Sequence, residues 1–343
     1  MSSLLISICI PVYNCGDYLG DALESILPQL NEEIEVIIYD GGSTDQTALV
    51  GDKYQRQSDF AIRYYRSPQR GGIDADMAKC VSLAQGQYCW LFSGDDTMRL
   101  GALAFMKEQV QTGCDVYIAT HTICDINMNI LREHPVLNID HKFQVDFSNE
   151  VERLSWFQAA VTSEAFFSFM SGLVVKRETW DSGRLIPQFD GSCWAHVARL
   201  LEISKHSLRV QFVTDILLDQ RGENDSFLDK GVINRYAIGI QGYSNIANFF
   251  YGEDSQEAFH IRRVIRNEFR LRSFLSAKIL TEFYPEIEKR EVLDSLLKTA
   301  YMDKSIKNFF VKTVYTIFPK SVFLVVRFFY RAFKRINVKF KNV

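Results

Sequence analysis

Short apolar runs alternate with helical repeats along the first 120 residues, and this alternation constrains the fold more than any other feature. Five runs have the length and apolar content of buried strands: 5–10, 35–39, 62–65, 87–92 and 116–119. Apolar residues recur at helical spacing between them, as in 18–27, 45–57 and 73–84. The sequence therefore predicts an α/β fold, with a doubly wound, mostly parallel sheet that carries helices on both faces.

An acidic turn follows two of these predicted strands. The turn 40–45 reads DGGSTD, and the turn 93–96 reads SGDD. Ligands bind beyond the carboxyl ends of strands in an open α/β sheet, where carboxylates suit a base edge or a hard divalent cation. The two turns predict an enzyme that acts on a nucleotide-linked substrate.

The pattern changes after about residue 120. The runs 166–170 and 173–175 are strand-like, 194–203 is helical, and the chain beyond about 230 reads as helices. We predict three segments: a catalytic domain over 1–220, a helical C-terminal region over 221–303, and a basic, aromatic, amphipathic tail over 304–343. A hydrophobic fraction of 47% excludes disorder as a description of the whole chain.

Charge is divided unevenly along the chain. Residues 304–343 contain ten Lys and Arg residues and no Asp or Glu, whereas the other 29 basic residues share 1–303 with all 42 acidic residues. The body therefore carries a net charge of −13 and the tail +10. An acidic body argues against nucleic acid as the main partner.

The tail predicts attachment to a membrane surface. Lys320, Arg327, Arg331 and Lys334 cluster on one side of a helix, and apolar and aromatic residues occupy the other. Its longest uncharged run, 321–326, is far shorter than the roughly 20 residues needed to span a bilayer. We expect the helix to lie on the anionic inner leaflet, and a basic helix packed on the acidic body is the alternative.

Cysteine usage and the start of the chain indicate the compartment. The seven cysteines form no pair with a two-residue gap, and the first residues show no basic leader. Both features favour a reducing cytosol. We therefore expect a cytoplasmic protein, peripheral at the inner face of the cell membrane.

The motifs at 10–14, 40–47 and 86–96 resemble, in order and spacing, those of family 2 glycosyltransferases of the GT-A fold. The resemblance covers the first 120 residues well and the next hundred loosely. The chain is most similar to bacterial surface-polysaccharide enzymes, and the segment 90–96 resembles O-antigen glycosyltransferases, including the dideoxyhexosyl (abequosyl) type. The resemblance implies an inverting, metal-dependent hexosyl- or deoxyhexosyltransferase of lipopolysaccharide biosynthesis, with a nucleotide-sugar donor.

The resemblance assigns the nucleoside pocket to the ends of the first two predicted strands. Pro11, Val12 and Tyr13 would line it, with the Tyr13 ring against the base. Asp40 matches the acidic residue that meets the base edge. An Asx-type turn between Asp40 and Ser43 is the alternative from the residues themselves.

Three further stretches are implied to contact the donor. Arg70 precedes a helix start and could meet a phosphate, or lie in a solvated turn. Asp74 and Asp76 lie in the stretch that runs beside the ribose in similar proteins. Arg221 lies in a loop that resembles the one closing over the diphosphate, and an exposed charged turn is the alternative.

The metal motif and the general base both depart from the family pattern. Asp95 and Asp96 match the end of the metal motif and would hold Mg²⁺ or Mn²⁺ at the diphosphate, but Ser93 replaces the frequent first Asp. Residues 192–193 are Ser-Cys where the family commonly has an acidic pair. Asp190 and His196 are the candidate bases, and a helix N-cap and a buried imidazole are their respective alternatives.

These departures leave two interpretations of function. In the first, the protein transfers a sugar to a hydroxyl of an acceptor, which we expect to be a lipid-linked saccharide because the tail predicts a membrane surface. In the second, it is a catalytically degenerate nucleotide-sugar-binding or scaffolding protein of a polysaccharide assembly complex. Turnover of the donor distinguishes them.

Overall fold

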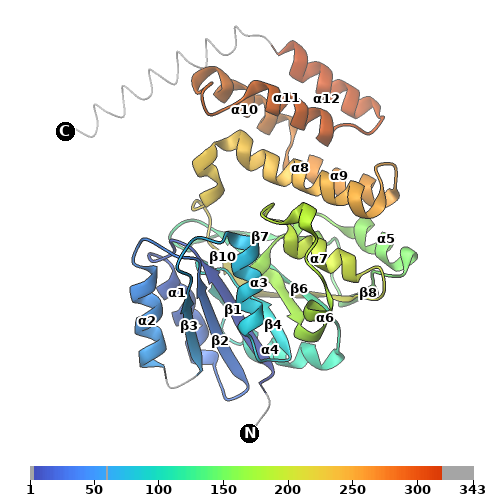
Figure 1. The fold of residues 1–343 in the computed structure, drawn as a ribbon. Coiled ribbons are helices and arrows are strands. Elements are labelled where there is room, and N and C mark those ends of the chain that lie inside the picture. Colours follow the sequence, from blue (N-terminus) through green and yellow to red (C-terminus); the bar gives the residue numbers. More distant parts are fainter. Residues whose placement is uncertain (1–3, 59–60, 319–343) are drawn as a thin grey trace, which may run out of the picture. The chain divides into compact units, whose positions relative to one another are not determined.

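The computed structural model describes residues 4–58 and 61–318 (Figure 1). The chain divides into two compact units, one made of Met1–Asp225 with Asn248–Val264 and the other of Ser226–Ala247 with Ile265–Val343. The three-segment division at 220 and 303 stays a prediction. The predicted tail helix after residue 318 lies outside the described residues.

The first unit contains a ten-stranded sheet with the order β3-β2-β1-β4-β9-β6-β10-β5, in which β7 pairs with β6 and β8 with β10. The strands are β1 Ile6–Val12, β2 Ile34–Asp40, β3 Ile62–Arg66, β4 Tyr88–Leu91, β5 Thr97–Met98, β6 Val116–Cys124, β7 Ile130–His134, β8 Phe143–Asp146, β9 Leu173–Lys176 and β10 Arg209–Gln220. The block β3-β2-β1-β4 is parallel throughout. Its strands therefore end at one edge of the sheet.

The other half of the sheet is mixed. β9 runs antiparallel between β4 and β6, while β6 and β10 pair in parallel. The short strands β5, β7 and β8 are antiparallel to their neighbours. The predicted α/β fold is confirmed, and its parallel pairing is concentrated in the first four strands along the chain.

Helices cover both faces of this sheet (Figure 1). Those of the first unit are α1 Leu19–Ile26, α2 Thr47–Gln57, α3 Ile73–Leu83, α4 Ala102–Gln109, α5 Glu150–Ala159, α6 Arg177–Ser182 and α7 Ala195–Ile203. Alternate side chains of β1, such as Ile8 and Ile10, share a buried core with Leu23 of α1 and Met106 of α4. α3 packs against β1 and β2. The doubly wound arrangement follows from these strands being apolar on both faces.

The strand expected at 166–170 is wrong. Two short 3₁₀ turns, Ser163–Phe166 and Met170–Gly172, occupy this stretch. The rings of Phe166 and Phe167 are buried against Phe157 and Phe147, with centroids 4.9 and 5.5 Å apart. Aromatic packing, rather than a strand ladder, explains the apolar run.

The helices predicted beyond residue 230 are confirmed. They are α8 Val232–Tyr251, α9 Gln256–Glu268, α10 Leu271–Phe283, α11 Arg290–Ala300 and α12 Ile306–Ile317. In the second unit, the Glu288 carboxylate accepts the backbone N–H groups of Val232 and Ile233 at 2.7 and 2.9 Å. This contact supplies acceptors for the free amides at the start of α8.

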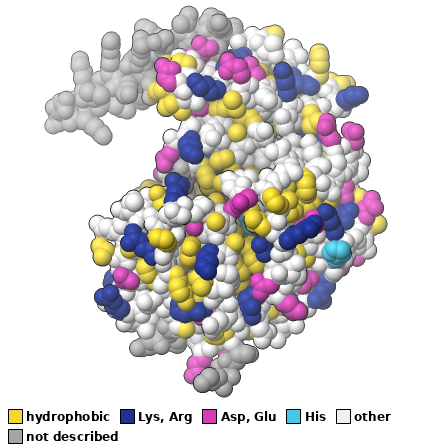
Figure 2. All heavy atoms as spheres, in the orientation of Figure 1, with side chains coloured by type: hydrophobic (Ala, Val, Ile, Leu, Met, Phe, Trp, Pro, Cys, Tyr) yellow, Lys and Arg dark blue, Asp and Glu magenta, His cyan; other side chains and the backbone are white. Residues whose placement is uncertain are grey.

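The described helices and the face drawn in Figure 2 bear on the predicted membrane surface. Among residues 4–58 and 61–318, no helix combines the length and apolarity that crossing a bilayer requires. Basic and acidic side chains are interspersed on the face drawn in Figure 2. The described part of this face therefore carries no continuous basic patch.

Candidate active site

The two acidic turns meet at the end of β1, the strand that lies between β2 and β4. The Gly41 amide donates to the Val12 carbonyl at 2.8 Å. On the other side, a Cβ added to Gly94 would lie 2.5 Å from Val12 Cγ1 and 3.1 Å from Cys15 Sγ, so only glycine fits. The segment 11–15 therefore lies between the two turns.

Asp40 forms the Asx-type turn with Ser43 that was the alternative to a contact with the base edge. Its carboxylate accepts the Ser43 amide at 2.7 Å and the Tyr64 hydroxyl at 2.6 Å, and Arg66 Nε lies 3.6 Å away. The side chain is fully buried. A base-edge contact by Asp40 would require this network to open, so the expected role in the pocket does not fit this arrangement.

Asp76 lies beside the two glycines that follow β2 and precede α3. A Cβ at Gly41 would overlap Asp76 Oδ2, and one at Gly71 would lie 2.8 Å from Oδ1. The residue is 5% exposed, yet its carboxylate accepts no hydrogen bond from the residues that the structure describes. Burial, followed by the charge of Asp40, raises the pKa of Asp76 to about 6, while Arg70 opposes the shift. Among the residues that the structure describes, Asp76 is thus a buried carboxylate without a hydrogen-bond donor.

Tyr13 and Arg70 come together next to Asp76. The Arg70 guanidinium lies 4.2 Å from the centre of the Tyr13 ring, in a cation–π contact. Arg70 is exposed and Tyr13 is half-buried, whereas Pro11 and Val12 are buried in β1. The structure therefore brings the Tyr13 ring and the Arg70 cation together, and the charge of Arg70 acts on Asp76; their assignment to a nucleotide stays a prediction.

The Asp74 carboxylate binds backbone amides before α7, whereas the sequence placed it beside the ribose. Its carboxylate accepts the amides of Cys193 and Ala195 at 2.8 and 3.3 Å, at the start of α7. Burial raises the pKa of Asp74, and these hydrogen bonds oppose the shift. Because Cys193 has a φ of +71°, a conformation that L side chains rarely adopt, the anchor holds a strained turn. Asp74 is thus a positioning residue for the loop before α7.

The two carboxylates of the metal motif differ. Asp95 is half-buried and accepts hydrogen bonds from Ser93 and Asn224. Asp96 is 2% exposed and accepts the Ser171 hydroxyl at 2.6 Å and the Arg221 amide at 3.0 Å. Burial, then the charge of Asp95, raises the pKa of Asp96 well above its usual range. Asp95 is therefore the more accessible of the two carboxylates, and Asp96 shapes the turn.

Arg221 is buried, and each of its three guanidinium nitrogens donates a hydrogen bond. Nε donates to the Asp95 carbonyl at 2.9 Å, Nη1 to the Ile126 carbonyl at 2.6 Å and Nη2 to Asp21 at 2.7 Å. The guanidinium also lies 4.9 Å from the centre of the Tyr18 ring. The predicted phosphate contact does not fit this geometry, and neither does an exposed turn, because the side chain instead fixes the backbone of the 93–96 turn.

The two candidate bases lie in contrasting surroundings. Asp190 is exposed, and it is near enough to Asp74 for its charge to raise the pKa of that residue. His196 is buried, donates Nε2–H to the Phe167 carbonyl at 2.9 Å, and has a pKa lowered to about 4 by burial. A base must reach the acceptor hydroxyl, so burial argues against His196, and Asp190 stays a prediction.

Sequence reasoning missed Ser171 and Asn224. The Ser171 hydroxyl binds Asp96, and its oxygen also accepts the Ser93 amide at 2.9 Å, although Ser171 lies 75 residues further along the chain than Asp96. Asn224 lies in the loop that the sequence singled out for Arg221. No local signal identifies Ser171, whereas the polar composition of 220–226 points to the neighbourhood of Asn224.

The oxygen atoms that the 93–96 turn offers as metal ligands suit a hard divalent cation. Asp95 supplies half-buried carboxylate oxygens, which Mg²⁺ and Mn²⁺ prefer, and Ser93 adds no carboxylate. Few protein ligands are typical of Mg²⁺ sites, in which substrate phosphates and waters complete the shell. The residues present therefore fit a cation held by Asp95 and the diphosphate of a donor.

Comparisons with known proteins cover different shares of the chain. Residues 7–167 match the family model described as Glycosyl transferase family 2. A Salmonella typhimurium protein named abequosyltransferase RfbV is 29% identical over 333 residues, which cover 91% of this chain and 98% of the relative. Glycosyltransferase GlyG of Streptococcus pneumoniae is 33% identical over 120 residues, covering 35% of this chain and 40% of GlyG.

Solved structures share the fold at low identity. S. aureus TarS 1-349 in complex with UDP-GlcNAc matches with a TM-score of 0.58 and 15% identity, covering 87% of this chain and 82% of that one. The mannosyltransferase PcManGT from Pyrobaculum calidifontis, in complex with GDP-Man and Mn2+, matches with a TM-score of 0.51 and 13% identity over 93% and 81% of the two chains. Residues 7–167 therefore carry a domain that matches glycosyl transferase family 2, and the described chain has the GT-A fold of these structures.

Proposed function

We propose that this glycosyltransferase is an inverting, divalent-cation-assisted enzyme that moves a sugar from a nucleotide-sugar donor to a hydroxyl of a lipid-linked saccharide. The observation that carries the proposal is the edge of the sheet at which Asp76 and Asp95 flank the segment 11–15. Asp76 and Tyr13 contact the nucleoside, Arg70 the donor phosphates, and Asp95 the cation. When bound, Mg²⁺ or Mn²⁺ neutralises charge on the departing diphosphate.

Asp190 is the proposed general base. It is exposed on the loop that Asp74 anchors at the start of α7, and a carboxylate there can accept the proton of an incoming hydroxyl. Removing a general base typically lowers the rate by about 10²–10⁴-fold. Asp190→Asn should therefore lower kcat strongly and leave donor affinity unchanged.

The donor sugar is proposed to be a deoxyhexose, and the pathway O-antigen biosynthesis. The support is the abequosyltransferase relative, which aligns over 98% of its own length. Because the two chains are only 29% identical, the proposal names the class of the sugar and not the sugar itself. A panel of hexosyl and deoxyhexosyl nucleotide donors tests it directly.

Attachment to the inner membrane face is supported by the described start of the predicted tail. α12 exposes the apolar side chains Ile306, Phe309 and Phe310, and the flanking Lys304 and Lys307 are also exposed. Exposed aromatic and basic residues on one helix suit an anionic headgroup layer. Deleting 319–343 and replacing Phe309 and Phe310 by Ser should move the protein from the membrane to the soluble fraction, with donor binding retained.

Donor turnover separates the enzyme from the scaffold interpretation. Incubation with nucleotide-sugars and Mn²⁺ should release nucleoside diphosphate, and Asp95→Ala should abolish the release. Asp140→Ala is the matched control, because the Asp140 side chain is fully exposed elsewhere in the unit. Tight nucleotide binding without turnover on any donor or acceptor extract would instead support a scaffold.

A further inference from the structure

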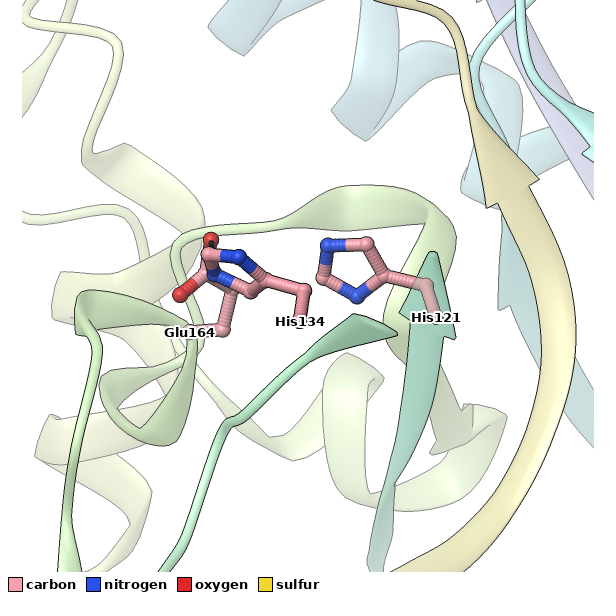
Figure 3. Close-up of side chains that lie close together, drawn as sticks. All are labelled: His121, His134 and Glu164. Carbon is pink, nitrogen blue, oxygen red and sulfur yellow. Dashed lines mark ion pairs between the residues drawn. The ribbon is translucent and has the colours of Figure 1, made fainter. Parts of the chain in front are cut away.

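A second group of metal-ligand side chains lies apart from the acidic turns. His121 on β6 and His134 on β7 are partners in the antiparallel ladder, and Glu164 comes from the 3₁₀ turn Ser163–Phe166. Figure 3 shows the three side chains directed toward one another from these elements. The candidate ligand atoms all lie within 4.8 Å of one another, and His134 Nε2 lies 3.0 Å from Glu164 Oε1.

The cluster is buried and poorly supplied with hydrogen bonds. His121 is fully buried and His134 is 9% exposed, with ring centroids 4.7 Å apart. Neither ring nitrogen of His121, nor Glu164 Oε2, has a hydrogen-bond partner of good geometry among the described residues, although Gln220 lies near His121 and Thr162 near Glu164. Buried polar atoms without partners are costly, and each instance calls for an explanation such as an ion.

We propose that His121, His134 and Glu164 bind a d-block divalent cation, for which Zn²⁺ is the best match. Two imidazoles and one carboxylate are a common donor set for Zn²⁺, whereas Mg²⁺ prefers oxygen donors alone. The His134 and Glu164 side chains are 11% and 16% exposed, which leaves access for the ion and a water as fourth ligand. The site differs from the one at Asp95 in both place and chemistry.

The site would organise the segment that supports the acidic turn. The Phe169 ring packs on His121 with centroids 4.3 Å apart, and Ser171 follows in the same segment and binds Asp96. The carbonyl of Phe167 accepts from His196. A cation that holds Glu164 against β6 and β7 therefore tethers one end of the segment 163–172, whose other end contacts the 93–96 turn. Its role is structural.

The test uses the full chain without a polyhistidine tag, stripped with a chelator and titrated with Zn²⁺ alone. We expect one Zn²⁺ per chain by elemental analysis, a raised Tm, and for Co²⁺ the d–d absorption of a nitrogen-ligated ion. Zn²⁺ affinity should fall by roughly tenfold or more in His121→Ala and Glu164→Gln, as is typical when a metal site loses a supporting contact. His141→Ala is the control, because His141 is exposed.

Asp95→Asn separates the two cation sites, because it should keep the Zn²⁺ stoichiometry while losing Mn²⁺-dependent donor binding. The proposal is overturned by a wild-type chain that binds no Zn²⁺, by His121→Ala binding it as tightly as wild type, or by loss of Zn²⁺ in Asp95→Asn. The Co²⁺ spectrum is read on wild-type protein, so the test does not depend on any variant folding.

Discussion

Replacing Asp76 by Asn should stabilise the fold. Asp76 is 5% exposed, has no hydrogen-bond donor among the described residues, and has a pKa raised from 3.8 to about 6 by burial and by the charge of Asp40. A pKa difference of this size corresponds to about 3 kcal/mol of cost for the ionised form at pH 7. Solvent at the rim lowers this figure, so we expect a gain of about 1–3 kcal/mol in the free energy of unfolding.

The sign of the pH dependence follows from the direction of the shift. The pKa of Asp76 is higher in the folded state than in the unfolded state, so between about 4 and 6 the folded chain holds the extra proton. The cost is therefore fully present above pH 6 and disappears toward pH 4. The difference in Tm between Asp76→Asn and wild type should be largest at pH 7–8 and shrink on acidification.

Loss of the Asp76 carboxylate should weaken nucleotide binding, although it stabilises the fold. A carboxylate kept without a protein donor can accept an N–H or O–H of the nucleoside, and hydrogen bonds to charged groups contribute about 1.5–3 kcal/mol. Asp76→Ala should therefore weaken nucleoside diphosphate binding by roughly 10- to 150-fold, measured by calorimetry with Mn²⁺. An Asp76→Asn protein less stable than wild type at pH 7 would refute the burial argument. Unchanged affinity in Asp76→Ala would refute the nucleoside contact.

Three other substitutions test the framework around Asp76. Asp74→Asn weakens the anchor at the start of α7, and should raise the KM for the acceptor while leaving calorimetric donor affinity within about twofold. Gly94→Ala forces a Cβ against Val12, so urea unfolding should show a loss of about 1–3 kcal/mol together with weaker Mn²⁺-dependent donor binding. Tyr64→Phe leaves the buried Asp40 short of a donor and should cost about 1–3 kcal/mol in the same unfolding assay, whereas wild-type stability would contradict the network.

The fold was predictable where the chain carries a strong local period. The four parallel strands and the helices between them follow from apolar runs and helical spacing, and the structure has them within a few residues. β7 was not predictable, because four of its five residues are exposed and show no alternation. β10 was missed because its buried positions come in runs instead of alternating with exposed ones. Long-range pairing thus decides the strands that sequence periodicity does not mark.

The site was predictable by position and less so by role. Sequence identified the two acidic turns, because carboxylates at strand ends form a local pattern. It did not identify Asp74 as the anchor of the loop before α7, because the carboxylate and its amides are 119 and 121 residues apart. Nor did it reveal that Gly41 leaves space for Asp76, since that contact joins the end of β2 to α3.

The carboxylates around the edge of the sheet follow one physical rule. Asp40, Asp74 and Asp96 are buried and accept hydrogen bonds from backbone amides, so their charge or dipole is satisfied by the protein and they define its shape. Within the described part of the chain, Asp76 is as buried and has no such donor, while Asp95 is half-buried and accepts from side chains alone. Side-chain donors rotate away at lower cost than backbone amides, so Asp95 can exchange them for a cation. In an acidic cluster at a strand end, carboxylates that accept backbone amides therefore stabilise the fold. Carboxylates without backbone donors are available to a ligand.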